Sequence, residues 1–253
     1  MGNHVPPHPP VKSEPEHSLS SRNEGMPFSI GAIGPRDLTG ARKVLLRASI
    51  SRVLRDVIEG LAPLMNLRAR PGSEVTRPRL VTALTGAADL LIVEEALAAG
   101  YHLSLILPRP RAEHLSRLGP DLEARAHRAI EQATEVSEPV SLFGAGEGGF
   151  GHAEMLGTQG DFRSRLLMAS DLLICVWDGE PGVEADSSGS VAISAAEQGI
   201  PVVWIASAPP HAIRLYGLSA PHPQSWNRIL PPDVLERLEQ LATPESEDYP
   251  TPS

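Results

Sequence analysis

The chain has 253 residues, of which 41% are hydrophobic and 21% charged, a balance typical of a globular protein with a sizeable core. Acidic residues outnumber basic ones by 31 to 22, so the formal net charge is −9 and we expect no direct nucleic-acid partner. The single cysteine, Cys175, excludes an intrachain disulfide framework and a Cys-rich zinc module, and it fits a reducing cytoplasm.

Two tails flank one predicted domain at residues 26–242. Residues 1–25 are rich in proline, serine and acidic side chains, which cannot bury enough apolar surface to offset the entropy of ordering, so we predict disorder there. Residues 243–253 are predicted to be either a flexible acidic tail or a linker to a further domain. No apolar stretch approaches the roughly 18 residues of a membrane span and the first ten residues lack a secretory signal, so we expect a cytoplasmic chain.

Short apolar runs alternate with helical stretches along the predicted domain. Strands are expected at 28–33, 80–84, 102–107, 140–143, 171–177 and 200–205. Helices are expected from about 38 to 59, at 87–99, as two helices within 111–134, and at 161–169, 188–198 and 232–242. Continuous apolar strands separated by helices indicate an α/β fold, Rossmann-like and doubly wound, with a mainly parallel sheet and helices on both faces. Ligands of such sheets bind at the carboxyl ends of the strands.

Gly34, Arg36 and Asp37 follow the first predicted strand. A glycine lets the backbone approach a ligand, amides at the start of the next helix attract anions, and Arg36 adds a bidentate donor for phosphate. The alternative is a tight turn with a surface arginine. After the second strand, Gly86 permits a similar approach, and Asp89 either orients a sugar hydroxyl or caps the following helix.

The strongest predicted strand, 171–177, is followed by a long polar loop that is costly to maintain unless something binds there. Asp178 and Gly179 begin this loop. Ser187, Ser188 and Gly189 end it and open a helix, where hydroxyls and unpaired amides predict a phosphate cradle. A serine N-cap uses the same groups and is the structural alternative.

Arg109, after the third strand, is a further candidate phosphate contact, although an arginine on a solvated loop is the default. Residues 144–149 satisfy GxGxxG, but they follow the weakest strand, and we interpret them as a flexible loop over the cleft. The sequence contains no P-loop, GxSxG or HExxH motif, and its histidines are scattered. We therefore expect no metal and no cofactor, and we expect Cys175 to be an inert core residue.

Several of these segments together resemble the SLOG superfamily, which includes the Lonely-Guy (LOG) phosphoribohydrolases, the DprA-like proteins and the sensor domains of TRPM channels. The resemblance spans about residues 28–206 in order and is carried by residues 31–36, 84–97, 105–108 and, most specifically, 169–179, which contain Trp177-Asp178-Gly179. It implies a Rossmann-like fold that binds nucleotides or nucleotide-derived signals at the strand-end cleft. Many bacterial members look like sensors attached to effectors in defence systems.

Two departures bear on function. Relatives commonly carry Gly-Gly-Thr where this chain has Asp186-Ser187-Ser188, so the cradle here would be built from hydroxyls beside an acid. LOG enzymes also place a glutamate one helical turn later, whereas residues 189–194 contain no acid. Without a carboxylate, the developing oxocarbenium charge of N-glycoside cleavage loses its main stabilisation.

We therefore expect a non-catalytic sensor domain that binds an ADP-ribose-like or cyclic nucleotide, acting as a homo-oligomer or with a fused or associated effector. One alternative is a LOG-type nucleotide N-glycoside hydrolase in which Asp178 or Glu180 replaces the missing acid. A second alternative is a structural or assembly domain whose cleft binds nothing.

Overall fold

A computed structural model of the chain describes residues 27–38, 43–68, 77–139, 162–179, 187–216 and 230–242. Both predicted tails lie outside these residues. The predicted strand at 140–143 and the GxGxxG segment at 144–149 lie outside them as well.

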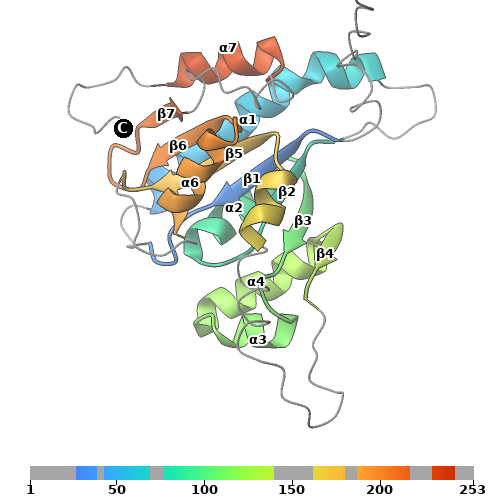
Figure 1. The fold of residues 1–253 in the computed structure, drawn as a ribbon, viewed down its shortest axis with the longest axis vertical. Coiled ribbons are helices and arrows are strands. Elements are labelled where there is room, and N and C mark those ends of the chain that lie inside the picture. The colour runs from blue at the N-terminus through green and yellow to red at the C-terminus, as the bar shows by residue number, and fades with distance from the viewer. Residues whose placement is uncertain are drawn as a thin grey trace, which may run out of the picture.

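Seven strands of the described chain form one sheet in the order β4-β3-β2-β1-β5-β6-β7 (Figure 1). Their bounds are β1 Ser29–Ile33, β2 Arg79–Thr82, β3 His102–Ile106, β4 Glu135–Ser137, β5 Leu172–Trp177, β6 Val202–Ala206 and β7 Ile213–Tyr216. All neighbouring pairs are parallel except β6 and β7, which are antiparallel. The mainly parallel sheet predicted from the sequence is confirmed.

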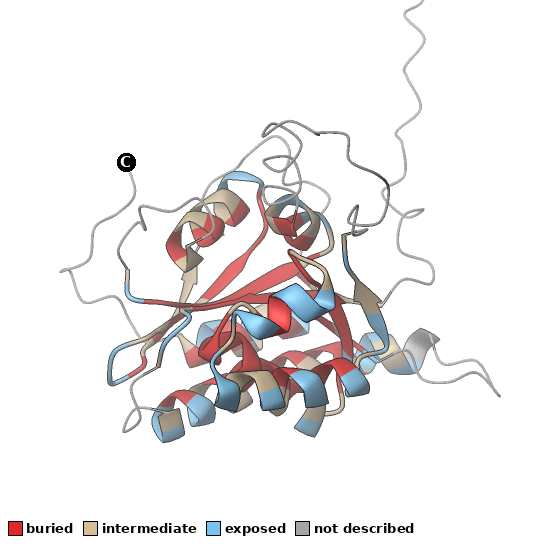
Figure 2. Ribbon diagram, turned by 90° about the horizontal axis from the view of Figure 1, so that it is seen from below, coloured by how far each residue is buried: buried red, intermediate tan, exposed pale blue. Residues whose placement is uncertain are grey.

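Helices of the described chain cover both faces of this sheet. They are α1 Lys43–Arg68, α2 Ala87–Ala98, α3 Arg111–Ser116, α4 Pro120–Gln132, a helix at residues 162–168, α6 Ser188–Glu197 and α7 Pro232–Leu241. In Figure 2 the strands are largely buried, while the helices are buried on one side and exposed on the other. None of the helices in this part of the chain combines the length and apolar character needed to cross a membrane.

The alternation of side chains along each strand divides the core in two. Leu172, Ile174 and Val176 of β5 belong to a cluster that also includes buried residues of α1, α2, α4 and α7. The intervening Leu173 and Cys175 belong to a second cluster with the helix at 162–168 and α6. This is the doubly wound arrangement that the sequence predicts. Cys175 is fully buried, and burial raises the pKa of its thiol, as expected of an inert core residue.

The strand order reverses at β1. The chain moves from β1 to β2, β3 and β4 on one side with α1, α2 and α4 over one face, and from β5 to β6 on the other side with α6 over the opposite face. Right-handed crossovers require this change of face. The point of reversal, between β1 and β5, is where open α/β sheets leave a crevice at the carboxyl ends of their strands.

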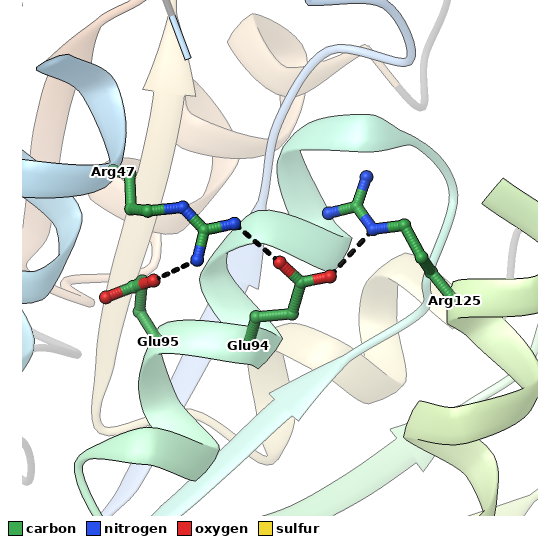
Figure 3. Close-up of polar contacts among 4 residues, drawn as sticks. All are labelled: Arg47, Glu94, Glu95 and Arg125. Atoms are coloured by element: carbon green, nitrogen blue, oxygen red, sulfur yellow. Dashed lines mark hydrogen bonds and ion pairs between the residues drawn. The ribbon is translucent and has the colours of Figure 1, made fainter. Parts of the chain in front are cut away.

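Three helices on one face are joined by ion pairs (Figure 3). Arg47 of α1 contacts Glu94 and Glu95 of α2, and Arg125 of α4 contacts Glu94 from the other side. The Arg47–Glu94 and Arg125–Glu94 distances are both 2.7 Å. These ion pairs link α1, α2 and α4, the helices of three successive crossover connections.

The structure differs from the sequence prediction at three elements. The helix predicted to end at residue 59 continues to Arg68, passing through Gly60 and Pro63. At Gly60 a Cβ atom would lie 2.8 Å from the Cα of Val234, so the glycine allows α7 to pack closely on α1. That packing keeps the helix intact where its local propensity is poor. Strands β4 and β7, both at edges of the sheet, were not predicted.

Candidate functional site

A cavity of about 410 Å³ lies at the carboxyl ends of β1, β2 and β3. It is formed by the loops after these strands, by α3 and the start of α4, and by the beginning of the helix at 162–168. The described residues that line it are Arg36, Asp37, Thr85, Gly86, Pro108, Arg109, His114, Arg117, Leu118, Gly119, Leu122 and Phe162. Four predicted site residues, Arg36, Asp37, Gly86 and Arg109, are therefore brought together.

The loops after β1 and β2 pack directly on each other. The amide of Ala87 donates to the carbonyl of Arg36 at 2.8 Å, and the amide of Ala88 donates to that of Pro35 at 3.3 Å. A Cβ atom at Gly86 would lie only 2.3 Å from the Cα of Arg36. The close approach that Gly86 permits is thus between two protein segments, and it fixes the backbone from which Arg36 projects.

Gly34 has a similar packing role. A Cβ atom there would lie 2.5 Å from the Cβ of Ala88 and 3.1 Å from that of Val176. The glycine therefore lets the start of α2 and the end of β5 close around the end of β1. A ligand contact at Gly34 or Gly86 stays a prediction; the packing explains both glycines without one.

The buried side chain of Asp89 links these two loops by hydrogen bonds. Its carboxylate is fully buried and accepts hydrogen bonds from the amide of Gly34 at 2.8 Å and from the amide and hydroxyl of Thr85, each at 2.7 Å. Burial raises the pKa of Asp89 to about 6, although the three donors favour the charged form. Asp89 does not cap α2, whose N-cap residue is Gly86 without a side-chain cap hydrogen bond. The contact of Asp89 with a sugar stays a prediction, which its buried position disfavours.

The floor of the cavity includes a buried histidine. His114 Nε2 lies 3.1 Å from the carbonyl oxygen of Leu84, to which the Nε2–H tautomer donates. Leu84 has a φ of +54°, a left-handed conformation that is uncommon for a large side chain and that turns the chain from β2 toward α2. Burial lowers the pKa of His114, and the nearby charges of Arg109 and Arg36 lower it further, so the ring is neutral at neutral pH.

Arginine side chains supply the charge of the cavity. Arg36 is exposed, and within the described part of the chain its guanidinium has no ion-pair or hydrogen-bond partner. Arg109 and Arg117 both contact Glu113, at 3.3 Å and 3.1 Å. The sequence analysis missed Arg117 and Glu113. The spacing of Arg109, Glu113 and Arg117, four residues apart in and beside α3, was a signal for their pairing.

One side of the cavity is apolar. Leu118 lies in the turn between α3 and α4, Leu122 is in the first turn of α4, and Phe162 begins the helix at 162–168 and is 4% exposed. Phe162 is distant from the three arginines in the sequence, and no local pattern indicated that it shares a cavity with them.

The remaining predicted site residues lie on the other side of the strand-order reversal. Asp178 is exposed after β5, and Gly179 has a φ of +98°, which explains the glycine. Ser187 is confirmed as the N-cap of α6, since its hydroxyl accepts from the amide of Ser190 at 3.2 Å. The amides of Ser188 and Gly189 have no acceptor within the helix, as at any helix start. The structural alternative for Ser187 is thus present, and a phosphate cradle at Ser187, Ser188 and Gly189 stays a prediction.

No protein-family model matches the chain, and no curated protein matches it. Within the described ranges, no group of three or more histidine, cysteine or acidic side chains is placed to hold a metal ion. A functional proposal therefore rests on the residues of the cavity and on the resemblance seen in the sequence.

Proposed function

We propose that this chain is a SLOG-like sensor domain that binds a phosphorylated, nucleotide-derived ligand in the cavity at the ends of β1, β2 and β3, without converting it. The observation that carries the proposal is Arg36. Its exposed guanidinium lines a cavity at the ligand-binding edge of a doubly wound sheet and lacks a partner within the described residues.

The charge of the cavity supports an anionic ligand. Arg36, Arg109 and Arg117 line it, and Asp37 is the one acid among the described lining residues. This local excess of positive charge stands against a net charge of −9 for the whole chain. Guanidinium groups bind phosphate and carboxylate oxygens through paired, charge-assisted hydrogen bonds, so the phosphate of a nucleotide is an anion that they fit.

The size and the apolar side of the cavity support a nucleoside. A volume of about 410 Å³ is within the range of about 300–1,000 Å³ that is typical of small-molecule sites. Phe162, Leu118 and Leu122 offer a surface against which a base can pack. A ligand with a charged end and an aromatic end matches this division of the lining.

The SLOG resemblance independently predicts a nucleotide-derived ligand at this edge of the sheet. The absence of an acid at residues 189–194 of α6 favours binding over N-glycoside cleavage. The LOG-type hydrolase remains the alternative that the test below must separate.

Thermal unfolding of the purified chain, with and without AMP, ADP, ADP-ribose and cyclic AMP, tests the proposal. We expect at least one of these nucleotides to raise the melting temperature, because a ligand that binds only the folded state stabilises it. Arg36→Glu should abolish the shift, whereas Arg52→Glu, on the exposed surface of α1, should keep it. An equal shift in wild type and Arg36→Glu would contradict the proposal.

The same mixtures decide between sensor and hydrolase. We expect the nucleotide to be recovered intact after prolonged incubation with the wild-type chain, measured by chromatography of the bases and nucleotides. Enzyme-dependent release of free base would establish the hydrolase instead.

A further inference from the structure

Glu113 forms ion pairs with two of the arginines that line the proposed ligand cavity. We propose that Arg109 and Arg117 form a second anion subsite, that Glu113 is its built-in competitor, and that the ligand carries two anionic groups. This inference rests on the proposed function and names the chemistry and the regulation of the same site.

The geometry of the pairs supports this role for Glu113. One carboxylate oxygen, Oε1, lies 3.3 Å from Nε of Arg109 and 3.1 Å from Nη2 of Arg117. Both arginines line the cavity, whereas Glu113 is not among its lining residues. A carboxylate that bridges two arginines from the edge of a cavity marks a place where a ligand phosphate or carboxylate can bind to the same donors.

Displacing Glu113 requires little free energy. Its side chain is 46% exposed, that of Arg117 is 60% exposed, and that of Arg109 is 20% exposed. Exposed ion pairs of this kind are worth about fivefold or less each in an equilibrium constant. A released carboxylate regains full hydration, so a phosphate with several oxygens can replace it with a net gain.

The separation of Arg36 from Arg109 along the sheet edge gives room for a second anionic group. Arg36 follows β1 and Arg109 follows β3, with β2 between these strands. Two strand spacings separate these strand ends by about 10 Å. A ligand with two anionic groups can pair with both positions, one at Arg36 and one at Arg109 and Arg117.

Calorimetric titration of the full chain with ADP and with AMP tests this inference, with inorganic pyrophosphate and inorganic phosphate as the matched pair that lacks a nucleoside. In the wild type we expect ADP to bind about tenfold or more tightly than AMP. Arg117→Ala should remove that preference by weakening ADP binding, while AMP binding stays unchanged. Arg128→Ala, on the exposed surface of α4, is the control and should keep the preference.

Glu113→Gln separates competition from a structural role. If Glu113 competes with the ligand, the substitution should tighten ADP binding by about twofold to tenfold and leave AMP binding unchanged. If Glu113 only positions the arginines, the same substitution should weaken ADP binding, which would overturn the inference.

The outcomes also separate this inference from the proposed function. The wild type could bind ADP and AMP with equal affinity, and Arg36→Glu could bind neither. That result would overturn the second subsite and leave the proposed function standing. A weakening of both nucleotides by Arg117→Ala would likewise refute a separate subsite. Absence of binding by both nucleotides and by pyrophosphate would overturn both.

Discussion

The carboxyl group of Asp89 is fully buried and accepts three hydrogen bonds. Burial and hydrogen bonding have opposite effects on its pKa. Burial disfavours the charged form, whereas the donors from Gly34 and Thr85 favour it. Burial is the larger effect and raises the pKa of Asp89 to about 6. The carboxyl group is therefore ionised at neutral pH but protonated in mildly acidic solution.

The stability of the fold should reflect this shift. Because the pKa in the folded state is above the unfolded value of 3.8, the folded state holds an extra proton between about pH 4 and pH 6. The free energy of unfolding then decreases as the pH rises through this window, by about 3 kcal/mol for two pKa units.

Asp89→Asn isolates this effect, because it removes the titrating group and leaves the others in place. Urea denaturation gives the free energy of unfolding of both proteins at each pH. We expect the difference, wild type minus Asp89→Asn, to decrease as the pH rises from 4 to 7. A difference that rises with pH would mean that the three donors outweigh burial.

The contact between Gly86 and the backbone of Arg36 gives a second prediction. Gly86→Ala should lower the free energy of unfolding by about 1–3 kcal/mol, because the added methyl group meets backbone that cannot move independently. Gly119→Ala is the matched control: its φ is −65°, no atom lies within 4 Å of an added Cβ, and we expect a change below about 1 kcal/mol. Equal effects in urea denaturation would contradict the packing role of Gly86.

At the residue scale, the sequence predicted that the loops after β1, β2 and β3 share one edge of the sheet, but it did not predict the contacts of each residue. Arg36 and Arg109 were predicted because arginines after parallel strands are recognisable in a sequence. The role of Asp89 was left open between two alternatives, because its partner Gly34 lies 55 residues away. A contact of that range depends on the folded structure and has no local signal.

At the scale of elements, Glu94 joins three helices through Arg47 and Arg125 (Figure 3). Partial burial alone would raise the pKa of Glu94, but hydrogen bonds from Arg125 and Arg47 outweigh it and hold the pKa below its usual value. A lowered pKa means that the contribution of Glu94 to stability is present above the unfolded pKa and is lost as the pH falls.

Glu94→Gln should therefore destabilise the fold at neutral pH by about 1 kcal/mol, a value limited by the partial exposure of the pairs. The loss should shrink at high salt, measured by thermal unfolding at two ionic strengths. Glu131→Gln, on the exposed surface of α4, is the control and should have no measurable effect. A loss that is independent of salt would indicate packing rather than charge.

The elements that the sequence predicted best are the ones with continuous apolar runs. β5 and α2 match their predicted positions to within a residue or two because both are buried along most of their length. β4 has three residues with no buried side chain, and β7 is mostly half-buried, so neither produces the apolar run of a central strand. Edge strands are set by pairing with a neighbour, which a local pattern does not report.

At the scale of the whole molecule, the strand order places the loops after β1, β2 and β3 at one edge of the sheet, and positive charge gathers there. The fold class followed from the alternation of strands and helices, because few topologies satisfy right-handed crossovers. The residues that line the cavity could not be predicted in the same way, because Phe162 reaches the cavity from a helix that follows β4 in the chain. These arginines form the proposed anion site of an otherwise acidic chain.

Native mass spectrometry of the full chain with AMP, ADP, ADP-ribose and cyclic AMP tests the existence of this site most directly. We predict a complex with one nucleotide per chain that survives Arg52→Glu and is lost in Arg36→Glu. A spectrum without any nucleotide complex, or one in which Arg36→Glu binds as well as the wild type, would contradict the account.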